Sequence, residues 1–264
     1  MMQQSSSQLV LPSVNGIQSK FLEMFYIDGK LILFTEVLNN TIKQKDLYVQ
    51  YINESGKIIG ESQLIGRLLD QNVACDFNVE LAQNKQNIFI HYFRPFSKYN
   101  EEPFYFKVLG SDLELIIDKQ VKLPMNNLNF DILQYKLHKS GKIYMLAKIT
   151  PEQRRKRSKG DVIYQYRLLV YDIEMKKVDN YDVRASKYIL KDIMLGVDFD
   201  GNVDIYATMT RKNKEELEGF FHKRLNIEEG DWMRAYSKKA NYLFERSEKP
   251  YFRNERVSEQ FGQI

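Results

Sequence analysis

The chain has 264 residues, of which 43% are hydrophobic and 28% are charged. At this length a folded chain buries about three quarters of its unfolded surface, so the composition supports a packed core and excludes a disordered chain. The 39 basic residues stand against 35 acidic ones, for a formal charge of +4, and this balance makes nucleic acid an unlikely partner.

Residues 1–20 form a polar leader that contains a single short apolar piece, Leu9 to Pro12. We expect this piece to be a closing strand for the last repeat. The leader has no apolar region typical of a signal peptide, and no later stretch is long enough for a transmembrane helix. As written, the chain is expected to be soluble. A place in the bacterial envelope stays open if a signal lies upstream of this sequence.

The first repeat spans residues 21–70. Its first strand ends at the turn Asp28-Gly29, and an apolar second strand, 31–37, follows. A third strand at 47–52 meets the turn Asn53 to Gly56, after which a fourth strand begins. Asp-Gly and Gly-containing turns between apolar runs are typical of β-hairpins, so this repeat is predicted to be a four-stranded antiparallel sheet.

The same pattern returns in residues 74–124, 128–186 and 188–236. The first turns begin at Asp28, Asn84, Ser140 and Asp200, at steps of about 56, 56 and 60 residues. The turns after the third strands, at Gly56, Ser111, Met175 and Gly230, lie about 55, 64 and 55 residues apart. Two separate markers therefore give one period, and a period of this size with strands is typical of propeller blades.

The predicted fold class is all-β and β-propeller-like. About four consecutive four-stranded antiparallel blades occupy residues 21–230, either as a small closed propeller or as part of a larger one. Residues 237–264 are predicted to form a charged C-terminal tail. The four first turns carry no shared catalytic side chain, so the repeat by itself predicts a scaffold and not an activity.

A basic loop breaks the period. The third repeat is about nine residues longer than the others, and the excess lies between its second and third strands, within residues 150–160. Insertions of this kind map to loops on one face of a repeat protein. Five positive charges there could contact an anionic ligand or a protein, and the alternative is a solvated loop. These predicted binding residues are Arg154, Arg155, Lys156, Arg157 and Lys159.

Other candidate sites are weaker. Asp198 to Asp204 begins like a calcium-binding loop, but Val203 and Met209 stand where such a loop needs glycine and a bidentate acid, so a hairpin turn is predicted. Cys75 is expected to be a small buried side chain and not a nucleophile. No spacing brings the histidines together, and no catalytic residue, metal or cofactor is predicted. The three histidines are His91, His138 and His222.

The aromatic residues recur at every second position of the strands, as in Phe104 and Phe106 and in Tyr164 and Tyr166. Side chains at this spacing share one face of a sheet. Packing between blades is the favoured interpretation, and a carbohydrate-binding platform is the alternative.

The recurring turn and apolar second strand, together with a third strand of the form Leu47 to Lys57, resemble the repeats of uncharacterised bacterial propeller proteins. In style they are similar to TolB-like and WD-repeat propellers. The single Trp and the absence of Gly-His and Trp-Asp pairs set the chain apart from true WD repeats. The resemblance implies a propeller fold and lends no catalytic residue.

Three functions follow as hypotheses. The leading one is a non-enzymatic binding or interaction module, whose partner is a protein or an anionic ligand. The first alternative is a propeller enzyme, a hydrolase or lyase with a site at the central channel. The second is a structural fragment of a larger bacterial envelope protein. Whether the protein is an enzyme is left open, and the sequence favours a protein without enzymatic activity.

Overall fold

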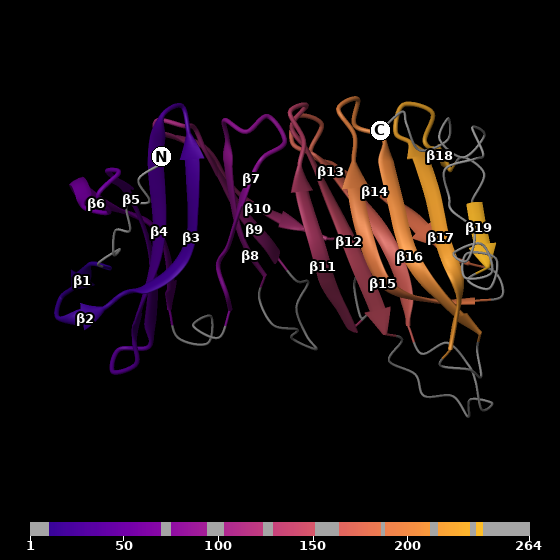
Figure 1. The fold of residues 1–264 in the computed structure, drawn as a ribbon, viewed down its shortest axis with the longest axis horizontal. Coiled ribbons are helices and arrows are strands. Elements are labelled where there is room, and N and C mark those ends of the chain that lie inside the picture. Colours follow the sequence, from indigo (N-terminus) through magenta and orange to yellow (C-terminus); the bar gives the residue numbers. More distant parts are fainter. Residues whose placement is uncertain are drawn as a thin grey trace, which may run out of the picture. The chain divides into compact units, whose positions relative to one another are not determined.

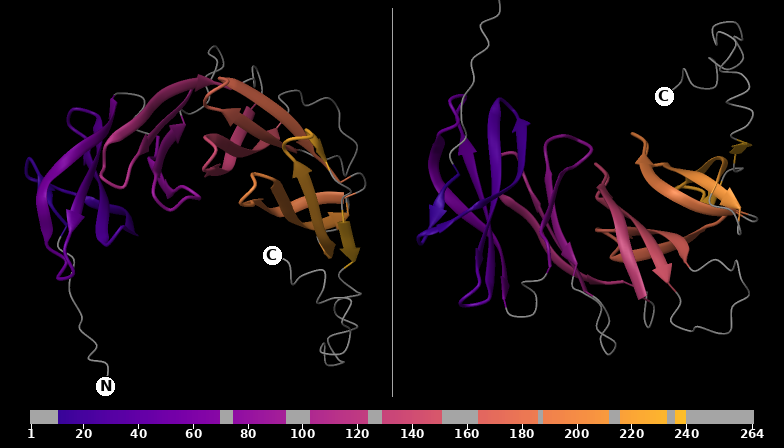
Figure 2. Two further views of the ribbon diagram at one scale, coloured as in Figure 1. Left: turned by 90° about the horizontal axis from the view of Figure 1, so that it is seen from above. Right: turned by 60° about the horizontal axis from the view of Figure 1, so that its bottom comes forward.

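The computed structural model describes residues 11–69, 75–93, 103–123, 129–150, 164–185, 188–211, 216–232 and 236–239. In these ranges the chain forms nineteen strands. They contain no helix long and apolar enough to cross a membrane. The strands of each sheet lie side by side in chain order, except that the last two strands of the fourth sheet both pair with its third strand, and each sheet is twisted (Figures 1 and 2).

The first two sheets are antiparallel meanders of four strands each, with the orders β3-β4-β5-β6 and β10-β9-β8-β7. A small hairpin, β1 (Ser13–Val14) with β2 (Ile17–Gln18), precedes them. The first sheet consists of β3 (Lys20–Ile27), β4 (Lys30–Asn39), β5 (Gln44–Ile52) and β6 (Ile58–Leu69). The second consists of β7 (Asn78–Leu81), β8 (Ile88–Phe93), β9 (Pro103–Leu109) and β10 (Leu115–Lys122).

The third and fourth sheets repeat this meander, and the fourth has one strand more. The third sheet consists of β11 (Asn129–Leu137), β12 (Lys142–Thr150), β13 (Gln165–Asp172) and β14 (Lys177–Val183). The fourth consists of β15 (Tyr188–Val197), β16 (Val203–Arg211), β17 (Leu217–Asn226), β18 (Asp231–Trp232) and β19 (Tyr236–Lys239). Both β18 and β19 pair with β17.

The turn between β3 and β4 shows why the first turn of each repeat favours particular residue types. Asp28 and Gly29 both have positive φ, 49° and 78°, which is the geometry of a two-residue hairpin whose twist matches that of its strands. Aspartate tolerates this region and glycine adopts it freely. The local sequence therefore fixes where the chain reverses.

The described chain divides into two compact units, and the division runs through the third sheet. In the first unit, side chains of the first two sheets share one core. Phe34, Leu47 and Val49 pack there with Phe77 and Ile88, and all five are nearly inaccessible to solvent. Alternation along each strand places these side chains on one face, so burial of that face joins the two sheets.

The second unit has its own core between the third and fourth sheets. Tyr144, Leu146 and Leu168 pack there with Val203 and Ile205, all at or near 0% exposure. The Tyr144 hydroxyl donates a hydrogen bond to the carbonyl of Gly201 at 2.9 Å. A buried tyrosine needs such a partner, and this one ties the third sheet to the turn before β16.

The predicted fold class is confirmed: the protein is all-β, with consecutive four-stranded antiparallel sheets of the propeller type. Within the predicted leader, Leu9 and Val10 lie outside the described residues, and the closing strand stays a prediction. β19 overlaps the first residues of the predicted tail. The aromatic residues Phe34, Phe104 and Phe106 are buried, as expected for packing between sheets.

Candidate functional site

The predicted basic loop does not belong to the part of the chain that the structure describes. Arg154, Arg155, Lys156, Arg157 and Lys159 all lie outside the described residues. Their role in binding an anionic ligand or a protein therefore stays a prediction.

The segment from Asp198 to Asp204 is a hairpin turn, as predicted. The Asp198 carboxylate accepts hydrogen bonds from the backbone N–H groups of Asp200 and Asn202, at 3.0 and 2.9 Å. Burial raises the pKa of Asp198, but the hydrogen bonds from Asn202 and the charge of Arg224 outweigh it and hold this pKa below its ordinary value. The carboxylate therefore stabilises its own turn while ionised.

The three histidines occupy three different environments. His91 on β8 is fully buried. His138 sits in the turn after β11, where its Nδ1 lies 2.8 Å from the Ser140 hydroxyl. His222 on β17 is partly exposed and faces a carboxylate. The three imidazoles therefore have different neighbours.

We expect His91 to make the free energy of unfolding depend on pH. Its ring lies 4.9 Å from that of Phe89 and 5.8 Å from that of Phe104. Burial lowers the pKa of His91, although Glu80, 3.8 Å away, partly opposes this. The unfolded chain, with a histidine pKa near 6.5, therefore binds more protons than the native one. The free energy of unfolding is therefore expected to be greatest above about pH 6.5 and to fall as the pH drops below this value.

We expect His91→Gln to flatten this dependence. Each unit of depressed pKa corresponds to about 1.4 kcal/mol in the free energy of unfolding. Urea unfolding at pH 7.5, 6.5 and 5.5 measures the slope in both proteins. An unchanged slope in the variant would assign the pH dependence to other groups.

His222 pairs with a carboxylate on the neighbouring strand. Its Nε2 lies 2.7 Å from Oδ1 of Asp204 on the neighbouring strand β16. Asp204 is largely buried, whereas the His222 side chain is 36% exposed. The imidazole can thus meet solvent or a substrate while the carboxylate behind it cannot.

Three further residues complete this cluster. Arg224 Nη1 donates to the second Asp204 oxygen at 2.9 Å, and Nη2 of the same guanidinium contacts the Asp198 carboxylate. The ring of Tyr206 stacks on that of His222, with centroids 4.7 Å apart and planes 10° apart. Burial, with the nearby Asp204 charge, raises the pKa of Tyr206. We call Asp198, Asp204, Tyr206, His222 and Arg224 the histidine cluster.

Strand register assembles the histidine cluster. Asp204 lies opposite Arg224, and Tyr206 lies opposite His222. Directly opposed side chains in an antiparallel pair share a face and lie about 5 Å apart at Cβ. The sequence carries a faint signal, since the polar residues on each strand are two positions apart, but sequence alone does not give the register that joins them.

This arrangement suits general-base chemistry. A carboxylate can only accept hydrogen bonds, so it fixes the neutral imidazole as the tautomer with hydrogen on Nε2. Nδ1, which makes no hydrogen bond within the described residues, then holds the lone pair that can take a proton. Arg224 holds Asp204 in place through the second carboxylate oxygen.

A metal centre has no support in the described ranges, where no group of three or more His, Cys, Asp or Glu side chains is placed to hold an ion. The histidine cluster has one imidazole and two carboxylates, both of which are already bound to Arg224.

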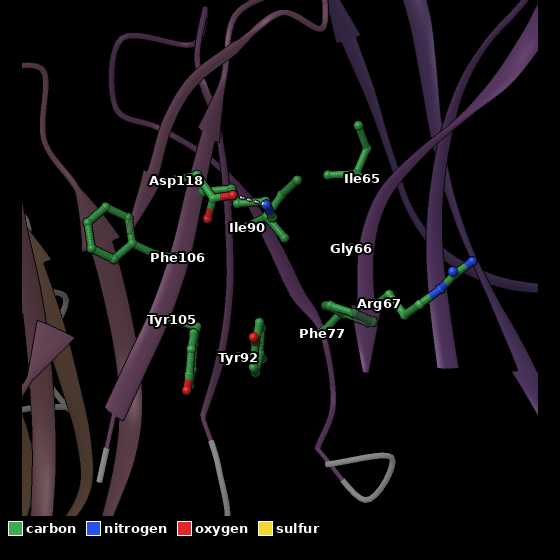
Figure 3. A pocket seen from close by; sticks show the side chains of 10 residues that line it. Ile65, Gly66, Arg67, Phe77, Ile90, Tyr92, Tyr105, Phe106 and Asp118 are labelled. Carbon is green, nitrogen blue, oxygen red and sulfur yellow. Dashed lines mark hydrogen bonds and ion pairs between the residues drawn. The ribbon is translucent and has the colours of Figure 1, made fainter. Parts of the chain in front are cut away.

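A pocket of about 250 Å³ lies in the first unit, between β6 and the strands β8, β9 and β10. Figure 3 shows the rings of Tyr92 and Tyr105 side by side in it, with Phe77 near Tyr92. Tyr92 and Tyr105 stack at 4.7 Å, and Phe77 meets Tyr92 edge to face at 5.7 Å. The Arg67 guanidinium points away (Figure 3) and binds Asp46.

Gly66 allows β6 to pack closely against the Phe77 ring on one wall of the pocket. A Cβ on Gly66 would lie 2.9 Å from Cε1 of Phe77, whose ring is buried. Only a residue without a side chain fits there without moving the ring. The opposite wall carries an ion pair between Lys107 and Asp118, which are register partners on β9 and β10.

No family model and no curated protein matches this sequence. The fold is similar to that of an acylaminoacyl peptidase from Pyrococcus horikoshii, with a TM-score of 0.52 at 10% identity, over 84% of this chain and 32% of that one. It is also similar to a cobalt-substituted Synechocystis protein named ACO, with a TM-score of 0.45 at 9% identity, over 85% of this chain and 51% of that one.

A thermostable family-43 glycoside hydrolase gives a TM-score of 0.41 at 14% identity, over 85% of this chain and 78% of that one. The chain thus spans about half the length of the Synechocystis protein and about a third of the peptidase. At such identities the likeness establishes the fold alone.

One prediction is corrected here. One propeller-type structure that this fold resembles, the peptidase, is an enzyme. This finding contradicts the leading hypothesis of a non-enzymatic binding module and favours the alternative, a propeller enzyme. The sequence pointed the other way because the groups that could do chemistry lie on different strands and have no motif spacing.

Proposed function

We propose that this protein is a propeller hydrolase in which His222 acts as a general base. The observation that carries the proposal is the 2.7 Å contact between Nε2 of a half-exposed imidazole and a largely buried carboxylate, Asp204. A general base needs a basic atom that is open to the reacting group and a partner that fixes its orientation.

The proposed step is simple. A water molecule gives a proton to Nδ1 of His222 as its oxygen attacks the electrophilic atom of the substrate. The bond from that atom to the leaving group then breaks, and the leaving group takes up the proton from Nδ1. The imidazolium that forms is stabilised by the Asp204 carboxylate, and Arg224 holds that carboxylate from its other oxygen. Tyr206, stacked on the ring, limits its rotation.

The comparisons support the class of reaction in one respect: the peptidase named above is itself a hydrolase. The chain spans only 32% of that protein, so the proposal names no substrate. A site at a central channel, as the sequence suggested for a propeller enzyme, remains a separate prediction.

A substrate screen tests the proposal. Purified protein and His222→Gln would be assayed against chromogenic esters, glycosides, phosphate esters and peptide amides. We expect cleavage by the native protein that the variant loses, with oxygen from labelled water in the product. A product without that label would indicate a lyase, in which His222 takes a proton from carbon. Equal activity in both proteins would refute the role of His222.

A further inference from the structure

We propose that the pocket of the first unit binds a free α-amino acid with an apolar side chain. The ligand's ammonium would lie at Asp118, its carboxylate at Lys107, and its side chain against Ile65, Phe77 and Ile90. This proposal concerns other residues than the histidine cluster and does not depend on hydrolase activity.

The apolar wall favours a side chain over a sugar ring. Tyr105 stacks on Tyr92, and Phe77 packs against the same tyrosine edge to face. The aromatic rings therefore pack mainly against one another, and they do not form the open, flat platform on which a sugar would stack. The aliphatic side chains of Ile65 and Ile90 also line the pocket. A branched or aromatic side chain fits such a wall through dispersion and burial.

The ion pair supplies the second half of the argument. Lys107 and Asp118 contact each other across β9 and β10, and their side chains are 23% and 55% exposed. A zwitterion that enters between them gives each charge a new partner. A simple anion would leave Asp118 next to a second negative charge, and a simple cation would leave Lys107 next to a second positive one. The pair thus selects a ligand with both charges.

The volume of the pocket suits a ligand of the size of an amino acid. The pocket volume of about 250 Å³ lies just below the range of about 300–1,000 Å³ that holds larger small-molecule ligands. A single amino acid is suited to it, and a longer peptide would have to extend past the exposed Asp118.

Isothermal titration calorimetry tests the proposal, with L-leucine and L-phenylalanine as ligands. The comparison ligands are N-acetyl-L-leucine, which lacks the ammonium, L-leucinamide, which lacks the carboxylate, and D-glucose. We expect both amino acids to bind at least about tenfold more tightly than the three comparison ligands, since each charge-assisted contact is worth about that factor.

Variants identify the site. Asp118→Asn and Lys107→Met should each weaken L-leucine binding about tenfold or more, and Ile65→Trp, which fills the pocket, should abolish it. The matched control is Asp182→Asn, which removes the comparable ion pair between β14 and Arg167 of β13, 3.4 Å apart. The affinity of the Asp182→Asn control for L-leucine should equal that of the native protein. Thermal unfolding of each variant confirms that it is folded.

The outcomes separate clearly. No amino-acid binding, equal binding of the blocked ligands, tighter binding of glucose, or an equal loss in Asp182→Asn would each overturn the proposal. Because the readout is binding heat and not turnover, failure of the hydrolase proposal would leave this result unaffected, and the reverse also holds.

Discussion

Lys45→Met is expected to lower the free energy of unfolding by about 3–5 kcal/mol, the cost of breaking a buried ion pair from one side. The Lys45 side chain on β5 is 7% exposed and that of Glu36 on β4 is 10% exposed, with 3.9 Å between Nζ and Oε2. Nζ also donates to the carbonyl of Cys75 at 2.8 Å. Cys75 is buried, as the sequence predicted.

The size of this effect comes from what remains after the substitution. Methionine preserves the length of the side chain, so little cavity forms, but the Glu36 carboxylate is left buried without its cation. A second contact of Lys45, to Asp76 at 3.2 Å, matters less because that carboxylate is 86% exposed and water screens it. The hydrogen bond from Lys45 to the Cys75 carbonyl also joins β5 to the chain just before β7.

Urea unfolding followed by circular dichroism measures the loss. The double variant Lys45→Met with Glu36→Leu removes both charges and should recover most of the stability. Lys136→Met is the matched control, because Lys136 is 53% exposed and its pair with Glu80 spans 3.6 Å; a loss below about 1 kcal/mol is expected there. A double variant as unstable as the single one would show that packing, and not charge, is the cause.

The lone tryptophan adds a useful probe. Trp232 lies on β18 in the second unit and packs against its core, whereas Lys45 lies in the first. If the units unfold separately, Lys45→Met should shift the transition seen by circular dichroism and leave that of Trp232 fluorescence unchanged. A common shift in both signals would indicate one cooperative transition.

Asp204→Asn is expected to lower turnover of any substrate found in the screen by about 10²–10⁴-fold, the usual contribution of a positioned general base. The asparagine amide can donate to Nε2 of His222, and the hydrogen of the imidazole then moves to Nδ1. That tautomer has no lone pair facing the attacking water. The shape of the site is preserved while its basicity is lost.

Glu218→Gln is the control for this substitution. Glu218 lies on the same strand pair, where it binds Nε of Arg211 at 3.0 Å, so the change also removes one carboxylate partner of an arginine. Its turnover should remain within about twofold of the native value. Comparable losses in both variants would attribute the effect to the sheet as a whole and not to the His222 tautomer.

The sequence was sufficient for the fold class because turns and alternation are local. The turn Asp28-Gly29 requires positive φ at both residues, and Asp198 stabilises its own hairpin through backbone contacts two and four residues away. Apolar residues at every second position then choose which face of each strand is buried. None of these choices depends on distant parts of the chain, and so they can be read directly.

The candidate sites could not be read in this way, because tertiary structure alone brings their residues together. His222 meets Asp204 only through the register of β16 and β17, and a shift of one residue would turn the two side chains to opposite faces. Lys45 reaches Cys75 thirty residues along the chain, and the pocket of the first unit joins β6 to β8, β9 and β10. The sequence by itself determined the strands, the turns and the repeat, which depend on neighbouring residues; the packing of strands and sheets decided which charges and rings meet, because these contacts depend on register and burial.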